Sequence, residues 1–168
     1  MNCKSLPIGD GAPIIVNTVV EIPSGSSNKY EYDMGLGVFR LDRVLYSPVH
    51  YPADYGFIPG TLGQDGDPLD VLILISQPTF PGCLVEARPV GMLDMVDDKG
   101  IDEKILAVAH GDPRYQRIED LARVEPHVLK EIEHFFNVYK NLEGRTSLTS
   151  GWLGLGAAHE RIETYRVR

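Results

Sequence analysis

The sequence predicts a mainly β fold with some α-helix (α+β), in which a small closed or nearly closed β-barrel carries helices on its outside. Two observations support this prediction. Short runs of β-branched and aromatic residues, separated by turn residues, fill the first two thirds of the chain. Helical periodicity becomes clear only after residue 126. Because no repeat or linker interrupts the pattern, we expect one domain spanning residues 1–168.

The β part is expected to consist of five to seven short strands. The segments predicted as strands are 14–22, 29–33, 38–45, 71–75, 84–96 and 105–109. Pro89 interrupts one of these and predicts a bulge or bend there. In 29–33 the charged Lys29, Glu31 and Asp33 alternate with tyrosines. That alternation fits either a half-exposed strand with solvated charges or a functional face.

The remaining segments are less regular. Residues 48–59 are rich in proline and aromatic residues, so we expect a stiff wall that presents tyrosine hydroxyls rather than a helix. A helix is predicted from Pro126 to a stop at Gly144, with Tyr139 and Lys140 in its last two turns. In its plain interpretation, Lys140 pairs with the helix dipole. A short helical turn is expected at 118–123, a last strand is compatible with 147–153, and 157–166 is predicted to be helical.

Composition and charge restrict the function. The chain has 16 lysines and arginines against 24 aspartates and glutamates, a formal net charge of −8. Such an acidic chain is a poor general binder of nucleic acid and would repel a small polyanion unless cations intervene. Cys3 and Cys83 indicate neither a zinc site nor a disulfide framework. We find no apolar stretch of about 18 residues and no secretory signal, so a cytoplasmic protein without membrane contact is expected.

A cluster of carboxylates lies where a polar loop meets the apolar run 71–75. Asp65, Asp67 and Asp70 fall within six residues, and an extended backbone would place the first two on one face. Pro68 can bend the chain enough to bring Asp70 round. The sequence therefore predicts a loop that holds divalent metal. A solvated Asp-Gly turn is the alternative, whereas a helix–loop–helix calcium site fails because Leu69 and Ser76 occupy ligand positions.

A second acidic turn, residues 97–104, is predicted to be a hairpin with Gly100 at its tip. Acidic hairpin tips are most often simply solvated. This one becomes a candidate for function because the first acidic loop needs partners.

The stretch Asp65-Gly66-Asp67-Pro68-Leu69-Asp70-Val71 matches the signature of family I soluble inorganic pyrophosphatases at every position, and the chain resembles this family over nearly its whole length. The other segments that carry the resemblance are Val20-Glu21-Ile22-Pro23, Lys29-Tyr30-Glu31, Asp42-Arg43, residues 51–58, Arg88-Pro89-Val90-Gly91, His134-Phe135-Phe136 and Tyr139-Lys140. Asp98 departs from the pattern, because many relatives carry glutamate there. His134 lies on a helix that relatives use between subunits, although a buried structural histidine is an equal alternative.

The resemblance implies a Mg²⁺-dependent hydrolase that cleaves diphosphate into two orthophosphates, on an OB-like five-stranded closed barrel with extra strands and two flanking C-terminal helices. It also implies a homohexamer and two activating Mg²⁺ ions, with more metal arriving with substrate. Asp65, Asp70 and Asp102 resemble ligands of the activating ions, and Asp97 and Asp102 those of the substrate-borne metal. Asp67 resembles the general base. Glu21 and Glu31 resemble the outer-shell acids, and the phosphate-binding set comprises Lys29, Arg43, Tyr55, Lys104, Tyr139 and Lys140.

Physical chemistry supports this set independently. Its seven acids and four cations carry a formal charge of −3, so an empty site would reject diphosphate, whereas two or more Mg²⁺ ions reverse the sign. The absence of His and Cys from the acidic set argues against zinc. In-line attack on phosphorus needs an activated water and neutralised oxygens. Four alternative functions fit the motifs or the charge less well. They are another type of metal phosphohydrolase, a nucleotide-sugar transferase, an oligonucleotide-binding module and an inactive relative.

Overall fold

The computed structural model of the chain describes residues 3–167. Within them the chain is mainly β with two α-helices, as predicted. The strands are β1 (Val16–Ile22), β2 (Asn28–Asp33), β3 (Val38–Val44), β4 (Asp54–Ile58), β5 (Leu69–Leu74), β6 (Leu84–Asp97), β7 (Gly100–Ile101), β8 (Lys104–Ala109) and β9 (Ser147–Leu153). The helices are α1 (Pro126–Val138) and α2 (Leu155–Tyr165), with short 3₁₀ helices at Cys3–Ser5, Pro113–Tyr115, Leu121–Arg123 and Asn141–Glu143.

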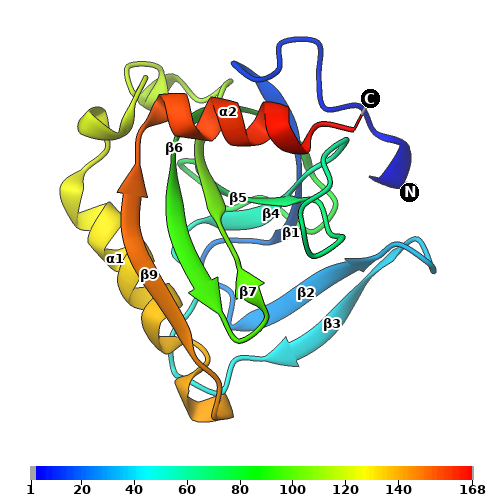
Figure 1. Cartoon of the computed structure of the whole chain (residues 1–168), viewed down its shortest axis with the longest axis vertical. Coiled ribbons are helices and arrows are strands. Elements are labelled where there is room, and N and C mark those ends of the chain that lie inside the picture. The colour runs from blue at the N-terminus through cyan, green and yellow to red at the C-terminus, as the bar shows by residue number, and fades with distance from the viewer. Residues whose placement is uncertain (1–2, 168) are drawn as a thin grey trace.

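Five strands pair in a ring. β1 pairs with β4 and β6, β4 with β5, and β8 with β6, all antiparallel, while β5 and β8 are parallel. β7 and β9 extend from β6, and β2 and β3 form a separate hairpin that projects to one side (Figure 1). The ring brings the ends of β1, β5 and β8 close to the hairpin, and this arrangement creates the site described below.

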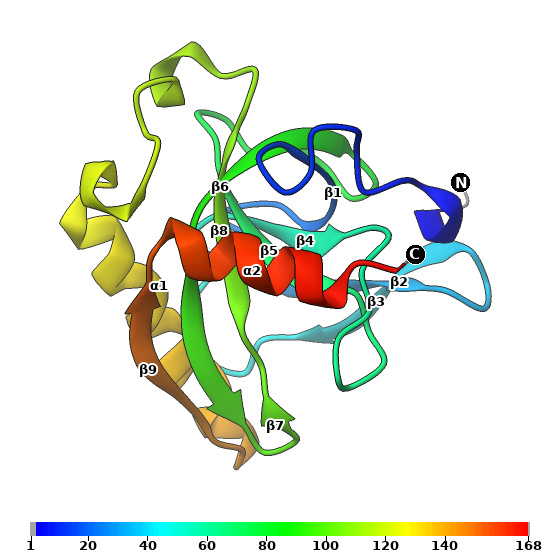
Figure 2. The same cartoon turned by 45° about the horizontal axis from the view of Figure 1, so that its top comes forward.

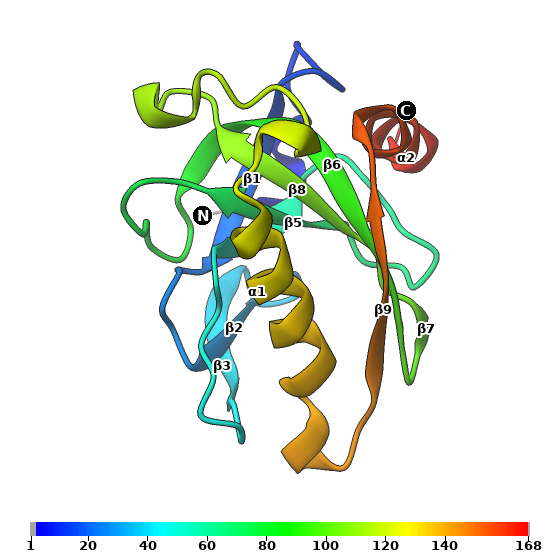
Figure 3. The ribbon, with the colours of Figure 1, turned by 90° about the vertical axis from the view of Figure 1, so that its left-hand side faces the viewer.

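The core consists of two main apolar layers, because β5 and β8 are buried on both faces. Leu72 and Leu106 belong to a cluster that also contains Phe136 of α1, whereas Val71 packs in a cluster with Ile162 of α2. α1 packs on β9 (Figure 3) and α2 packs across β6 (Figure 2). Burial on both sides explains why the sequence of β5 and β8 is continuously apolar rather than alternating.

The structure corrects two predictions. Residues 48–59 were expected to be a stiff, non-helical wall and not a strand, but β4 runs through them and is buried along its length, while Tyr55 directs its hydroxyl to Asp70 as a wall of this kind would. Gly56 allows this strand to approach β1, because a Cβ there would lie 1.9 Å from the Val19 carbonyl oxygen. The predicted helix from Pro126 ends at Val138, so Tyr139 is its C-cap and Lys140 lies beyond it. A 3₁₀ turn then leads to Gly144, which adopts a left-handed conformation.

The last strand is present as β9, and the register of β6 against β8 shifts between Pro89 and Gly91, as the proline indicated. The turn expected at 118–123 is reduced to Leu121–Arg123. His134 is exposed, so its interpretation as a buried structural histidine is wrong. No helix in the described part of the chain is long and apolar enough to span a membrane.

Candidate active site

A cleft of about 510 Å³ opens between the strand ring and the β2–β3 hairpin. All thirteen site residues expected from the sequence line it, although they come from distant parts of the chain. They are Glu21, Lys29, Glu31, Arg43, Tyr55, Asp65, Asp67, Asp70, Asp97, Asp102, Lys104, Tyr139 and Lys140. Folding thus brings together the two acidic turns, the hairpin and the segment after α1.

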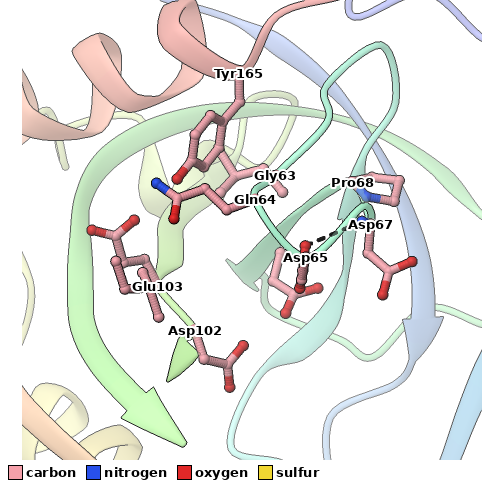
Figure 4. A pocket seen from close by; sticks show the side chains of 11 residues that line it. Gly63, Gln64, Asp65, Asp67, Pro68, Asp102, Glu103 and Tyr165 are labelled. Atoms are coloured by element: carbon pink, nitrogen blue, oxygen red, sulfur yellow. Dashed lines mark hydrogen bonds between the residues drawn. The ribbon is translucent and has the colours of Figure 1, made fainter. Parts of the chain in front are cut away.

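The first acidic loop is a turn rather than an extended segment. The Asp67 N–H donates to Asp65 Oδ1 at 3.1 Å, and the Gly63 N–H donates to the Asp67 carbonyl at 2.7 Å. Gly66 has φ +89°, which only glycine adopts readily. The backbone is therefore not extended here, so the shared face expected of an extended segment does not apply to Asp65 and Asp67. Both side chains are exposed at the rim of a small pocket that Asp102 also lines (Figure 4).

Lys104 connects the acidic loop to the second acidic turn. Its Nζ lies 2.6 Å from Asp70 Oδ2 and 2.5 Å from Asp102 Oδ1, and its side chain is only 3% exposed. The parallel register of β5 and β8 sets Asp70 directly beside Lys104. The Tyr55 hydroxyl also donates to Asp70 Oδ2, at 2.6 Å. Strand pairing therefore fixes the positions of a cation, two carboxylates and a phenol.

Lys140 pairs with a carboxylate rather than with the end of the helix. Its Nζ donates to Asp97 Oδ2 at 2.7 Å, and both side chains are largely buried. Asp98, the position that departs from the family pattern, is held by Arg145 at 3.1 Å. The segment after α1 thus supplies two cations to the second acidic turn, and the interpretation of Lys140 as a partner of the helix dipole is wrong.

The β2–β3 hairpin supplies the opposite wall. Lys29 lies next to a shift in the register of β2 against β3 and is paired with Arg43 across the hairpin. The two cations therefore lie at the same end of the hairpin. Asp42 lies between them, 3.4 Å from Lys29 Nζ and 2.6 Å from Arg43 Nη1. Lys29 also pairs with Glu31. Glu143, which is largely buried, pairs with Arg43 Nε at 2.5 Å and ties the hairpin to the segment after α1.

Sequence reasoning missed some of these residues. Asp42 was part of a recognised motif but received no role, and Glu143 and Arg145 were not singled out. All three serve cations or carboxylates of the cleft. Their only sequence signal is proximity to Arg43 or to the end of α1. That signal could not reveal which residue each of them pairs with, because every one of these ion pairs except Asp42–Arg43 joins residues that are far apart in the chain.

The electrostatics of the cleft favour an added cation. Counting the residues that line it, eight carboxylates face six basic side chains, which leaves a formal charge of −2. Burial raises the pKa of Glu21 to about 8. Partial removal from water at the wall of the cleft, followed by the charges of Asp65 and Asp70, raises the pKa of Asp67, although most of its side chain is exposed. Each raised pKa means that burial, together with neighbouring carboxylates, disfavours the ionised form more than the nearby cations favour it.

The basic partners show the opposite effect. Burial alone would lower the pKa of Lys104, but the carboxylates of Asp70 and Asp102 outweigh it and raise that pKa. Burial raises the pKa of Asp102, although Lys104 opposes the shift. Lys104 is therefore firmly protonated and shared, so one cation cannot fully compensate the carboxylates around it.

The donor set fits a hard divalent cation. The unpaired acids of the cleft offer oxygen only, and within residues 3–167 no group of three or more His, Cys, Asp or Glu side chains closes into a metal cage. Mg²⁺ is held in this way, by one or two carboxylates completed by water and phosphate oxygens, rather than in an all-protein cage. The residues present therefore fit Mg²⁺, although the arrangement specifies no number of ions.

A cleft in which free carboxylates face lysines and arginines is typical of enzymes that transfer or hydrolyse phosphate groups with divalent metal. Comparison with known proteins is specific. The family model described as inorganic pyrophosphatase matches residues 18–168, and the chain belongs to this family. The resemblance drawn from the sequence is thus confirmed.

Individual relatives match most of the chain. An inorganic pyrophosphatase of Methanosarcina acetivorans is 53% identical over 154 residues, 92% of each chain. One from Nostoc sp. is 55% identical over 140 residues, 83% of each chain. The crystal structure of inorganic pyrophosphatase from Thermus thermophilus superposes with a TM-score of 0.96 at 49% identity and covers 98% of this chain and 97% of that one.

Proposed function

We propose that this protein hydrolyses inorganic diphosphate to two orthophosphates in a Mg²⁺-dependent reaction. The observation that carries the proposal is the cleft itself, in which carboxylates with too little cationic compensation face a wall of fixed cations. A diphosphate needs both features, because its phosphate oxygens need cations and its bridging P–O bond needs an attacking water. Membership of the inorganic pyrophosphatase family supports this substrate.

The cations of the cleft are proposed to bind the two phosphate groups. Lys29 and Arg43 stand on the hairpin, and Lys104 and Lys140 on the opposite wall. Tyr55 and Tyr139 have hydroxyls that burial and nearby acids keep protonated, since the pKa of each is raised. Tyr139 can therefore donate a hydrogen bond to a phosphate oxygen throughout the physiological pH range, and Tyr55 can do so once its proton is released from Asp70.

Asp65, Asp70 and Asp102 would hold the activating metal, and Asp97 and Asp102 the metal that accompanies substrate. When bound, Mg²⁺ neutralises phosphate oxygens and makes an adjacent water more acidic. Glu21 and Glu31 line the same cleft without belonging to this ligand set. Lys104 donates hydrogen bonds to both Asp70 and Asp102, and these bonds orient the two carboxylates before any ligand binds.

Asp67 is proposed to accept the proton of the attacking water. It is exposed to the cleft, and its raised pKa gives it a better affinity for a proton than an ordinary aspartate has. The water oxygen forms a new bond to one phosphorus while the bridging P–O bond breaks. The leaving phosphate is stabilised by the cations around it, and the proton resides first on Asp67.

The deciding measurement is orthophosphate release from diphosphate by the wild type, with Mg²⁺ and with EDTA, and by Asp67→Asn. We expect release only with metal, and a fall in the rate by about two or more orders of magnitude in the variant, the usual scale for loss of a general base. Asp10→Asn, the same substitution at an exposed aspartate outside the cleft, should behave as wild type. Wild type without metal-dependent release would refute the function, whereas an unaffected Asp67→Asn would refute only the base.

The chain is further proposed to act as one domain of residues 1–168 within a cytoplasmic homohexamer. The family resemblance supports this assembly, and so do apolar side chains on β3 and its turn that would otherwise face water, namely Leu36, Leu41 and Val44. Light scattering after size exclusion should give the mass of a hexamer. A monomeric mass at micromolar concentration would contradict the assembly without affecting the chemistry.

A further inference from the structure

The residue between two proposed site residues points away from the cleft. Glu103 lies between Asp102 and Lys104, and its carboxylate reaches Arg161 of α2, with Oε1 2.7 Å from Nη2. Its side chain is 7% exposed and that of Arg161 is 29% exposed. Because one short segment carries all three residues, the position of Glu103 constrains the backbone from which Asp102 and Lys104 project.

Arg161 is itself held in place by its own helix. Its Nη1 donates to the Tyr165 hydroxyl at 3.2 Å, and its guanidinium lies 5.4 Å from the centre of the Tyr165 ring. Tyr165 also lines the small pocket between the two acidic segments, together with Gln64, Asp102 and Glu103 (Figure 4). One turn of α2 therefore orients the arginine that reaches the second acidic turn.

The same end of α2 is also attached to the first acidic loop. The Leu62 N–H donates to the Tyr165 carbonyl at 2.8 Å, and the Val167 N–H donates to the Gly60 carbonyl at 2.9 Å. These backbone bonds anchor the start of the loop that carries Asp65 and Asp67. The C-terminal helix thus contacts both segments whose carboxylates face each other across the pocket.

We propose that the Arg161–Glu103 ion pair is a positioning device that fixes Asp102 and Lys104 relative to the Asp65–Asp70 loop and so sets the affinity of the site for Mg²⁺. The inference rests on the proposed function for its metal, but it concerns two residues that do not line the large cleft. Partners behind a metal ligand commonly alter affinity by about 10-fold to 100-fold when they are removed.

The physical reason is the cost of leaving a buried charge without its partner. In Arg161→Gln the Glu103 carboxylate keeps its charge but loses its cation, and it can regain stability by turning toward water. That rotation would displace Asp102 and Lys104, which are adjacent in the chain. Arg161→Lys keeps a cation within reach and should preserve most of the arrangement.

The test is Mg²⁺ binding measured by isothermal titration calorimetry without substrate, combined with hydrolysis of diphosphate across a range of Mg²⁺ concentrations. We expect Arg161→Gln to bind Mg²⁺ about tenfold more weakly, with a matching rise in the Mg²⁺ needed for half-maximal activity. The rate at saturating Mg²⁺ should stay within about twofold of wild type, because the metal restores the geometry once bound. Arg161→Lys should lie within about threefold of wild type in affinity.

Arg166→Gln is the matched control, because Arg166 follows the same helix and pairs with Glu163 on the surface. It should bind Mg²⁺ as wild type does. Circular dichroism verifies folding, and should Arg161→Gln not fold, Glu103→Gln and Arg161→Lys carry the test. Folded variants with unchanged Mg²⁺ affinity would overturn the proposal. A wild type that binds Mg²⁺ but does not hydrolyse diphosphate would overturn the proposed function while leaving the positioning role testable by calorimetry.

Discussion

The two sides of the cleft use the same residue types in opposite ways. On the strand side, Asp70, Asp97 and Asp102 each accept a hydrogen bond from a buried lysine at 2.5–2.7 Å. On the loop side, Asp65 and Asp67 are exposed, and within the described residues neither lies within ion-pair distance of a basic side chain.

This difference separates two tasks. Carboxylates paired with buried lysines have fixed positions, and their negative charge is already shared. Carboxylates on a glycine-containing turn keep their charge available for a metal ion or a proton. We therefore expect the strand side to contribute to the stability of the free protein as well as to metal binding, and the loop side to contribute to chemistry at almost no cost in stability.

The largest effect is expected for Lys104→Met, measured by urea denaturation in EDTA. Removing the lysine leaves Asp70 and Asp102 without their shared cation, so the free energy of unfolding should fall by about 3–5 kcal/mol. Lys99→Met, the same substitution at an exposed lysine of the cleft, should change it by less than about 0.5 kcal/mol. Equal losses in the two variants would contradict the assignment of stability to the strand side.

An intermediate effect is expected for Glu21→Gln, and it should depend on pH. Burial raises the pKa of Glu21 in the folded protein to about 8, above the ordinary value of 4.5. Between these values the folded state binds more protons than the unfolded state, so the stability of the wild type falls as pH rises through that window. Glutamine does not ionise, so this fall should be absent in the variant.

Urea denaturation in EDTA at several pH values between 5 and 8 measures this effect directly. The stability of Glu21→Gln relative to wild type should rise across the window by more than about 1.4 kcal/mol, the equivalent of one pKa unit. Glu119→Gln, at an exposed glutamate outside the cleft, serves as the control. If the difference in stability between the two proteins does not change with pH, the pKa of Glu21 is not raised in the folded protein.

The smallest effect on stability is expected for Asp65→Asn. Asparagine keeps a side-chain oxygen that can accept the hydrogen bond from the Asp67 N–H. The free energy of unfolding in EDTA should therefore change by less than about 0.5 kcal/mol. Binding of Mg²⁺, measured by calorimetry, should nevertheless weaken by about tenfold or more, because a charged ligand becomes neutral. A loss of stability comparable to that of Lys104→Met would remove the distinction between the two sides.

Much of the site was predictable because its residues are chemically conspicuous. The spacing of Asp65, Asp67 and Asp70 indicated function from local pattern alone. The charged alternation at Lys29 and the acidic turn near Asp102 became candidates only beside that loop and the family resemblance. Strand positions followed from β-branched runs, since burial on one or both faces dictates apolar composition. The mainly β fold with late helices could be predicted for the same reason.

Local pattern failed wherever a distant partner decided the conformation. β4 lies in a segment rich in proline and aromatic residues. Glycine is needed at position 56 only because β1 lies so close to it, which the local sequence does not show. The helix from Pro126 stops at Val138, before the glycine that was expected to stop it, and Lys140 beyond it bonds to Asp97, 43 residues earlier in the chain.

By itself, then, the sequence determined which side chains could do the chemistry and the kind of fold that holds them, because residue type and periodicity are local properties. Tertiary structure alone decided which carboxylates have a cation and which do not. It set Lys104 between Asp70 and Asp102 through the register of two parallel strands, and it left Asp67 exposed on a turn. The reason is that an ion pair forms only when two charges lie within a few ångströms of each other. The number of residues between two segments does not tell how close their side chains lie in the folded protein.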